Sequence, residues 1–187
     1  MRCESCAREF HARAGARTCS TRCRVRAHRA RVNPIPRELL ERDRWVTHRG
    51  KVPVTPFGSA ASSTDPSTWR DYATAAAAVS RCGMDGVGFV LNGDGIACID
   101  LDHCIREDGS LEPWAAEIVA ACPMTYMEIS PSGTGLHIFG LAEVGTGRRC
   151  GGVEVYDRGR YMTVTGRRWG SAPCRLSSIS AIVAQLV

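Results

Sequence analysis

The sequence predicts an α+β fold, with helices packed on a mixed or antiparallel sheet and a small metal-binding module near the N-terminus. Two observations support this class. Short stretches rich in β-branched and aromatic residues alternate with a few amphipathic helical stretches, without the regular strand–helix repeat of a parallel sheet. Four cysteines in two close pairs lie within the first 23 of the 187 residues. We therefore expect a zinc-binding basic module at residues 1–32, a linker at 33–36 and one larger domain at 37–187.

The N-terminal module is defined by the spacing Cys3-x2-Cys6 and Cys19-x3-Cys23. Each pair can place two thiolates on one ion, so together they form a tetrahedral structural Zn²⁺ site. About 30 residues bury too little surface to fold unaided, so the metal would supply folding free energy. The alternative is a disordered basic tail that carries cysteines.

Charge is unevenly distributed along the chain. Residues 1–44 contain twelve arginines against five acids, whereas residues 45–187 contain twelve basic residues against fourteen acids. The arginine-rich run at 24–31 suits a short basic helix that contacts phosphates without sequence preference. A solvated helix face, enriched in arginine by coding bias, is the alternative. The prolines at 34 and 36 resist helix continuation and favour a linker there.

Localisation is expected to be cytoplasmic. The first residues are rich in cysteine and arginine and lack the apolar core of a secretory signal. No run approaches the roughly 18 apolar residues that cross a bilayer, so no membrane partner is expected. In that compartment the ten cysteines are expected to be metal ligands or buried thiols rather than disulfides.

The larger domain begins with a strand at Trp45–His48, and an alanine-rich helix follows at 71–81, before Gly83. The run Asn92–Gly95 resembles a hairpin turn and is expected to pair the strands on either side of it. Leu111–Cys122 is amphipathic and ends at a proline. The expected strands are 45–48, 86–91, 96–102, 125–129, 136–140, 153–156 and 161–165, and the expected helices are 71–81, 111–122 and 179–186.

Asp100 and Asp102 end a buried apolar strand. Residues two apart on a strand point to the same face, so both carboxylates leave one side of the sheet. Two like charges held this close repel each other, and a divalent cation relieves the repulsion. An oxygen-rich site of this kind suits Mg²⁺ or Mn²⁺. A bare surface pair at a strand end is the alternative.

Two further segments carry polar groups next to strands. The turn from Ser130 to Gly135 is built of small and hydroxyl residues, and its free backbone N–H groups can cradle phosphate oxygens; His137 follows on a strand. Glu154 lies inside an apolar strand, where a charge is costly unless it is paired or metal-bound. An ordinary loop and a structural histidine are the alternatives for the first segment. Asp157 competes with Glu154 for the role of third acid.

The order of these motifs resembles the archaeo-eukaryotic primase superfamily, specifically phage and plasmid primase–polymerases. The resemblance runs from about residue 44 to 166. It includes Ile99-Asp100-Leu101-Asp102, Glu128-Ile129-Ser130-Pro131-Ser132-Gly133-Thr134-Gly135-Leu136-His137 and Val153-Glu154-Val155-Tyr156 followed by Arg160-Tyr161 and Thr165-Gly166. It implies a primase–polymerase core with one half like an RNA-recognition motif. The zinc segment resembles small fingers attached to mobile-element and phage replication proteins.

The resemblance also implies roles. The catalytic and metal-binding set would be Asp100, Asp102 and Glu154, with His137 beside them. The nucleotide's triphosphate would be held by the following residues: Lys51, Ser130, Ser132, Gly133, Gly135, His137, Arg149 and Arg160.

The implied activity is template-directed nucleotidyl transfer in phage or mobile-element DNA replication. Its partners would be single-stranded DNA and NTPs or dNTPs. The sequence contains no Walker motif, so a helicase would be a separate chain or absent. The alternatives are an inactive zinc-finger DNA-binding replication factor and a metal-dependent nuclease.

Overall fold

The computed structural model describes residues 1–11, 15–32 and 34–186. Asn33 of the predicted linker and Val187 lie outside this part of the chain. In chain order the elements are α1 (Thr21–Val32), α2 (Arg37–Leu40), β1 (Trp45–Arg49), β2 (Val52–Val54), η1 (Pro66–Thr68), α3 (Tyr72–Cys82), β3 (Gly86–Asn92), β4 (Ile96–Leu101), α4 (Pro113–Ala121), β5 (Tyr126–Ile129), β6 (Leu136–Leu141), β7 (Arg148–Cys150), β8 (Val153–Tyr156), β9 (Arg158–Val164) and α5 (Ser180–Leu186).

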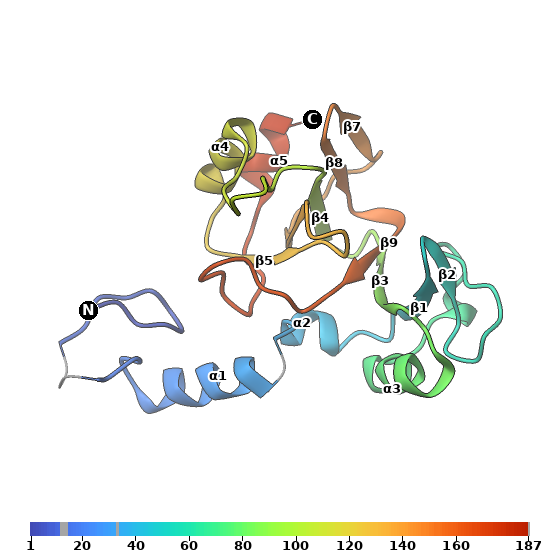
Figure 1. Cartoon of the computed structure of the whole chain (residues 1–187), viewed down its shortest axis with the longest axis horizontal. Helices are drawn as coiled ribbons and strands as arrows, with labels where there is room; N and C mark the ends of the chain where they lie inside the picture. The colour runs from blue at the N-terminus through green and yellow to red at the C-terminus, as the bar shows by residue number, and fades with distance from the viewer. Residues whose placement is uncertain (12–14, 33, 187) are drawn as a thin grey trace.

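The strands form two antiparallel sheets, which confirms the predicted α+β class at that level (Figure 1). One sheet has four strands in the order β2-β1-β3-β9, and the other has five in the order β5-β6-β4-β8-β7. All pairings between these strands are antiparallel.

The predicted hairpin at Asn92–Gly95 is wrong. The strands on either side belong to different sheets: β3 pairs with β1 and β9, whereas β4 pairs with β6 and β8. The turn therefore carries the chain from one sheet to the other. Arg44, buried at the start of β1, holds this crossover through an ion pair of 2.9 Å with Asp94 and a hydrogen bond to Asn92. A tertiary contact decides the pairing here, and local turn residues cannot reveal it.

The two faces of the five-stranded sheet face different cores. Ile99 of β4 and Val155 of β8 pack with Ile182 of α5 and Ala115 of α4 on the outer face. On the inner face, Cys98 and its neighbours pack against Trp45 and Phe89 of the four-stranded sheet. Both sides of β4 are thus buried, as the continuous run of small and apolar residues at Ile96–Ile99 predicts.

The helices begin and end where the sequence indicates. The Asp71 side chain accepts the Thr74 N–H at 2.9 Å to cap α3, and Gly83 ends it in the left-handed conformation at φ 61°. Pro113 opens α4 at its first turn, where a missing N–H costs nothing.

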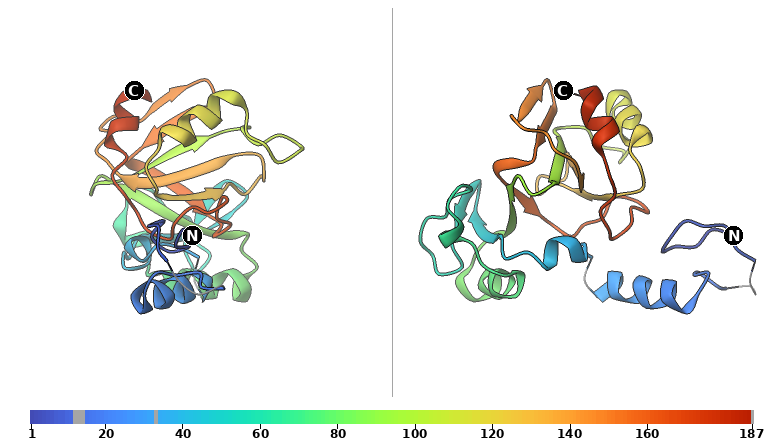
Figure 2. Two further views of the ribbon diagram at one scale, coloured as in Figure 1. Left: turned by 90° about the vertical axis from the view of Figure 1, so that its left-hand side faces the viewer. Right: turned by 180° about the vertical axis from the view of Figure 1, so that it is seen from behind.

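Residues 1–11 and 15–32 lie at one side of the sheets, and α2 lies between α1 and the sheets (Figures 1 and 2). The predicted basic helix is confirmed as α1, which begins at Thr21, two residues before Cys23, the last cysteine of the cluster. No helix in the described ranges is long and apolar enough to cross a membrane. The boundaries of the two predicted domains remain a prediction.

Candidate functional site

A row of charged residues crosses the inner face of the five-stranded sheet. Strand register pairs Glu128 with His137, His137 with Asp100, Asp100 with Glu154, and Glu154 with Arg149. Directly opposed residues on antiparallel strands point to the same face, so five strands contribute one side chain each to a single line. The spatial proximity that the sequence motifs predict for Asp100, His137 and Glu154 is present.

Asp100 is at the centre of this row and its side chain is 18% exposed. Burial raises the pKa of its carboxyl above the usual value, and the charges of Asp102 and Glu154 raise it further. The charges of His137 and Arg160 oppose this shift. Burial and the neighbouring negative charges both disfavour the ionised form of Asp100. A cation bound at this position would offset these effects and favour the ionised carboxylate.

Asp102 lies just beyond the end of β4 and is exposed. Its backbone N–H donates to the Gly152 carbonyl at 2.8 Å, which fixes the end of β4 against the β7–β8 turn. His103, the next residue, has φ 50°, in the left-handed region that residues other than glycine rarely adopt. The chain therefore turns sharply at the exposed acid instead of continuing the strand.

Glu154 is held by cations in this structure. Its carboxylate forms an ion pair with Arg149 at 3.1 Å, lies 3.8 Å from Arg160, and accepts the Tyr156 hydroxyl at 2.9 Å. Arg160 stacks over the Tyr156 ring at 4.5 Å and donates to its hydroxyl at 2.8 Å. Two of the three predicted phosphate-binding cations thus stand beside the predicted third acid.

Asp157, the competing third acid, has a different environment. It is fully buried and accepts the backbone N–H groups of Val144 at 2.9 Å and Gly145 at 3.4 Å, together with the Arg158 guanidinium. Burial acts to raise the pKa of its carboxyl, but these donors outweigh burial and lower it. These contacts indicate a structural acid, whereas Glu154 faces Asp100.

His137 is 3% exposed and is flanked by two carboxylates. Its Nδ1 lies 3.3 Å from Glu128 Oε1, and its Nε2 lies 3.7 Å from Asp100 Oδ1. Burial acts to lower the pKa of this imidazole, but the hydrogen bond with Glu128 and the charges of both acids raise it above the usual value.

The turn from Ser130 to Gly135 lies against the end of β4. A Cβ on Gly135 would come within 2.8 Å of the Leu101 carbonyl and 2.9 Å of Ser130 Oγ, so only glycine fits there. The Thr134 carbonyl accepts the Ile105 N–H at 2.9 Å. The turn is thereby fixed beside the predicted metal-binding acids.

The expectation of free backbone N–H groups in this turn is wrong for four of them. Ser130 N–H donates to the Gly135 carbonyl at 2.9 Å, and Gly133 N–H donates to the Ser130 carbonyl at 3.0 Å. Thr134 N–H donates to Ser132 Oγ at 3.3 Å, and Gly135 N–H donates to Ser130 Oγ at 3.1 Å. The hydroxyls themselves form a chain from Ser130 through Ser132 to Thr134, with steps of 3.0 Å. Such short turns satisfy their donors internally, so the exposed hydroxyls of Ser132 and Thr134 are what the turn presents to solvent.

Lys51 belongs to the other sheet. It is exposed in the turn between β1 and β2, where its carbonyl accepts the Tyr161 hydroxyl at 2.7 Å. Its role in phosphate binding stays a prediction without a described contact to the charged row.

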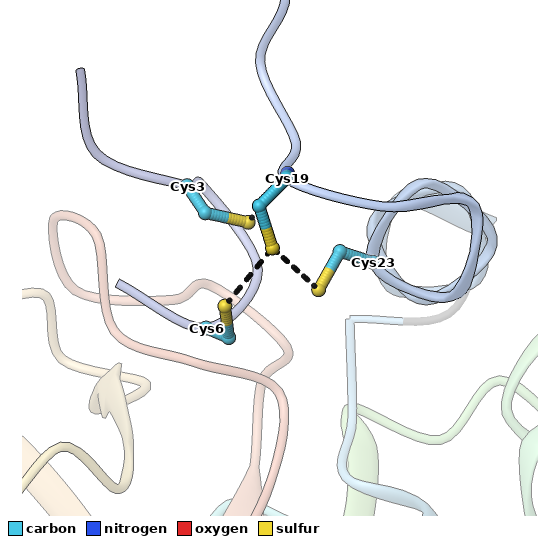
Figure 3. A group of neighbouring side chains, drawn as sticks. All are labelled: Cys3, Cys6, Cys19 and Cys23. Atoms are coloured by element: carbon cyan, nitrogen blue, oxygen red, sulfur yellow. Dashed lines mark hydrogen bonds between the residues drawn. The ribbon is translucent and has the colours of Figure 1, made fainter. Parts of the chain in front are cut away.

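The four N-terminal cysteines gather as their spacing predicts (Figure 3). Their sulfurs all lie within 4.8 Å of one another, and Cys19 Sγ is 3.6 Å from the sulfurs of both Cys6 and Cys23. Tetrahedral zinc, with bonds of about 2.3 Å, separates its sulfurs by about 3.8 Å, so the arrangement is compatible with zinc. Burial acts to raise the pKa of the Cys3 thiol, but backbone N–H groups, first that of Cys19, lower it to about 6. A thiolate is the form that binds metal.

The carboxylates are more open than this cluster. In the described ranges, no other group of three or more acidic, histidine or cysteine residues is gathered closely enough to hold one metal ion together. Asp100, Asp102 and Glu154 thus form an open acidic edge, with Arg149 and Arg160 as the cations beside it.

Comparison with known proteins gives one informative relative. A protein named DNA Primase-polymerase, from Nitratiruptor phage NrS-1, is 40% identical over 133 residues. The chain is similar to a phage primase–polymerase. The match covers 65% of this chain but 18% of the relative, so the chain spans a small part of that protein's length. No protein-family model matches the chain.

Sequence reasoning assigned no role to Glu128, although the residue lies in one of the motifs that carry the family resemblance. The signal was present, since Glu128 is an acid in the apolar stretch Tyr126–Ile129, the same pattern that singled out Glu154. The structure makes it the first member of the charged row. Tyr156, which contacts both Glu154 and Arg160, was likewise assigned no role, because a tyrosine on a half-buried strand is ordinary.

Proposed function

We propose that the chain is a DNA primase–polymerase domain of the archaeo-eukaryotic primase superfamily, which performs template-directed nucleotidyl transfer in phage or mobile-element replication. The observation that carries the proposal is the cross-strand row His137–Asp100–Glu154 in a chain 40% identical to a phage DNA primase-polymerase. Aligned register on three neighbouring strands supports the proposal, because it brings together the residues to which the resemblance assigns this chemistry.

The donor set fits a hard divalent cation. It offers carboxylate oxygens. Burial raises the pKa of the Asp100 carboxyl, and the negative charges of Asp102 and Glu154 raise it further. Asp100, Asp102 and Glu154 would hold Mg²⁺ or Mn²⁺, which supplies activation of the attacking 3′-hydroxyl and charge neutralisation at the leaving pyrophosphate.

The chain's own cations and hydroxyls would bind and orient the nucleotide. Burial acts to lower the pKa of His137, but its acidic neighbours raise that pKa above the usual value and so favour the charged imidazolium. His137 would contact the triphosphate together with the hydroxyls of the Ser130–Gly135 turn. Arg149 and Arg160 flank Glu154 and would move their positive charge to the phosphates when a cation neutralises that acid. Lys51 would add a further phosphate contact.

The N-terminal module would bind single-stranded DNA. Cys3, Cys6, Cys19 and Cys23 would hold Zn²⁺, which orders residues 1–32, and the arginine-rich α1 would contact template phosphates. NTPs or dNTPs are the second substrate, and a helicase would act as a separate partner. The host-cell cytoplasm is the place where such a protein would work.

Incubation of the chain with single-stranded DNA, Mg²⁺ or Mn²⁺ and labelled nucleotides tests the proposal. Products longer than any added primer, or new oligonucleotides on an unprimed template, are expected. Asp100→Asn should abolish synthesis, because it keeps the side-chain shape but removes the charge. Asp108→Asn, a change at an exposed acid outside the row, should retain activity.

Other outcomes would identify other functions. Shortened DNA in the presence of metal would indicate a nuclease. A gel shift without any product would indicate a DNA-binding replication factor. Full synthesis by Asp100→Asn would refute the assignment of the carboxylate site.

A further inference from the structure

Glu128 is a buried carboxylate at one end of the charged row. Its exposed fraction is 0%, and it lies on β5 rather than among the exposed acids at the end of β4. Removing a carboxylate from water costs several kcal/mol unless other groups compensate it. The structure must therefore supply donors, and it supplies them from three different segments.

Backbone and hydroxyl donors fix this carboxylate in place. The Tyr126 hydroxyl donates to Glu128 Oε2 at 2.6 Å, and the Gly166 N–H donates to the same oxygen at 2.9 Å. The Thr165 N–H lies 3.1 Å from both oxygens. These donors leave Oε1 facing the remaining partner, His137. Three rigidly placed donors make Glu128 an acceptor of fixed position.

The imidazole of His137 is oriented by this acceptor. The 3.3 Å contact between Nδ1 and Glu128 Oε1 requires a proton on Nδ1, because an ionised carboxylate only accepts. Nε2 is then the nitrogen that faces Asp100, at 3.7 Å. The ring meets Phe139 edge-on, with centroids 6.3 Å apart, so packing restricts its rotation as well.

We propose that Glu128 is a positioning residue: it holds His137 with Nδ1 protonated and Nε2 directed to the Asp100 side, where the nucleotide's phosphates would lie. The contact between Nε2 and the nucleotide's phosphates rests on the proposed function. The way in which Glu128 holds the imidazole ring does not. Mutation of a carboxylate that orients a metal-ligating histidine typically changes metal affinity or activity 10- to 100-fold, and we expect an effect of this size on nucleotide binding for Glu128.

A purely structural role is the competing explanation, since Glu128 also anchors the Thr165–Gly166 turn. The two roles differ in one respect. A positioning residue acts through His137, so its removal has no further effect once His137 is gone. An anchor of the turn has the same effect whether or not His137 is present.

The first experiment reads the ring directly and needs no catalysis. Long-range ¹H–¹⁵N NMR of the imidazole in the wild-type chain should show Nδ1 protonated. Glu128→Gln should shift the Nδ1 resonance, while Glu117→Gln, at an exposed acid on α4, should leave it unchanged. A neutral wild-type ring with its proton on Nε2 alone would overturn the proposal, and this measurement holds even where Glu128→Gln fails to fold.

The second experiment is a double-mutant cycle of Glu128→Gln and His137→Ala, with the Kd of a non-hydrolysable nucleoside triphosphate as the readout. Glu128→Gln should weaken binding about 10- to 100-fold in the wild-type background. The same change should have less than about a twofold effect in the His137→Ala background. Equal losses in both backgrounds would overturn the positioning role.

Failure of the proposed function gives a different result. If no nucleoside triphosphate binds any of the four proteins, the primase–polymerase proposal fails while the NMR result still decides how His137 is held. Tyr126→Phe provides a milder variant, because it keeps the carboxylate and removes one donor. It should fold, and it should shift the His137 Nδ1 resonance less than Glu128→Gln does; an equal or larger shift would contradict the role assigned to the charge of Glu128.

Discussion

At the scale of single residues, function depends on how each charge is neutralised. Glu154 and Glu128 are both acids in short apolar strands, yet their partners differ. Glu154 is partly exposed and paired with exposed arginine side chains, whereas Glu128 is fully buried and bonded to backbone N–H groups. Exchangeable partners suit an acid that must accept a metal ion, and fixed partners suit one that orients a neighbour. Sequence reasoning identified Glu154 as a costly charge but not Glu128, and it could not tell which partners either acid has.

Arg160→Met should raise the KM for nucleotide about tenfold with a smaller effect on kcat. The guanidinium stacks on Tyr156 beside Glu154 and is proposed to bind phosphate, so its loss weakens ground-state binding. Steady-state incorporation kinetics measure this split. Arg106→Met removes an exposed arginine paired with Glu112 and provides the matched control. An unchanged KM in Arg160→Met would exclude the phosphate contact.

Asp157→Asn should lower the free energy of unfolding at pH 7 by about 2 kcal/mol, because a buried charge-assisted set of hydrogen bonds is weakened. The pKa of Asp157 is lowered in the folded state, so its contribution is complete above the unfolded value of about 3.9 and is lost as pH falls through the folded value. Urea denaturation of both proteins at pH 7 and at pH 3 tests this. The stability difference should shrink at the lower pH; a constant difference would contradict the electrostatic explanation.

At the scale of elements, most strands and helices follow from the sequence, because apolar alternation and capping residues are local signals. The helix at 72–82 matches the predicted one within a residue at each end, since Asp71 and Gly83 cap it. The strands β2 and β7 were missed, because each has only three residues; β2 has a proline at its centre, and β7 is mostly arginine. The partition into two sheets could not be predicted, since it depends on the contact between Arg44 and the crossover at Asp94.

Gly135→Ala should reduce nucleotide incorporation at least tenfold and destabilise the fold by about 1–3 kcal/mol. The added methyl group would overlap the Leu101 carbonyl and Ser130 Oγ, so the turn must move away from the end of β4. Gly109→Ala is the control: its φ of 79° strains an alanine by about 1–2 kcal/mol, but open space surrounds it and it lies outside the charged row. Assays of activity and thermal unfolding separate the two effects. Normal activity in Gly135→Ala would show that the turn tolerates displacement.

At the scale of the whole molecule, the spacing of the cysteines and the uneven charge predict an N-terminal cysteine module followed by a larger α+β body. The spacing of the cysteine pairs is sufficient to predict their gathering, because four sulfurs near one ion need little else from the fold. Which residues face each other across the five-stranded sheet needed strand register, which long-range pairing fixes. The sequence therefore predicted which residues between Asp100 and Glu154 form the candidate site, but it did not predict their order across the five strands.

Chelation of zinc should abolish binding to single-stranded DNA. It should have a much smaller effect on the unfolding transition of the two sheets. Cys6→Ser should lower the bound zinc from one equivalent towards none, as measured by elemental analysis, and weaken DNA binding. Cys82→Ser, at an exposed cysteine outside the cluster, should change neither. The DNA affinity of the intact chain should fall steeply with salt, because it depends on phosphate contacts. Retention of full DNA binding without zinc would contradict the proposal that the zinc-bound module binds the template.

One strand of the four-stranded sheet touches the charged row at two places. Arg160 of β9 reaches Glu154, and the residues that directly follow the same strand, Thr165 and Gly166, bond Glu128. A minimal fragment made of the five-stranded sheet alone would keep the proposed metal-binding carboxylates, but it would lose Arg160 and the N–H donors to Glu128. A smaller catalytic fragment should therefore be made by shortening peripheral loops while keeping β9 intact.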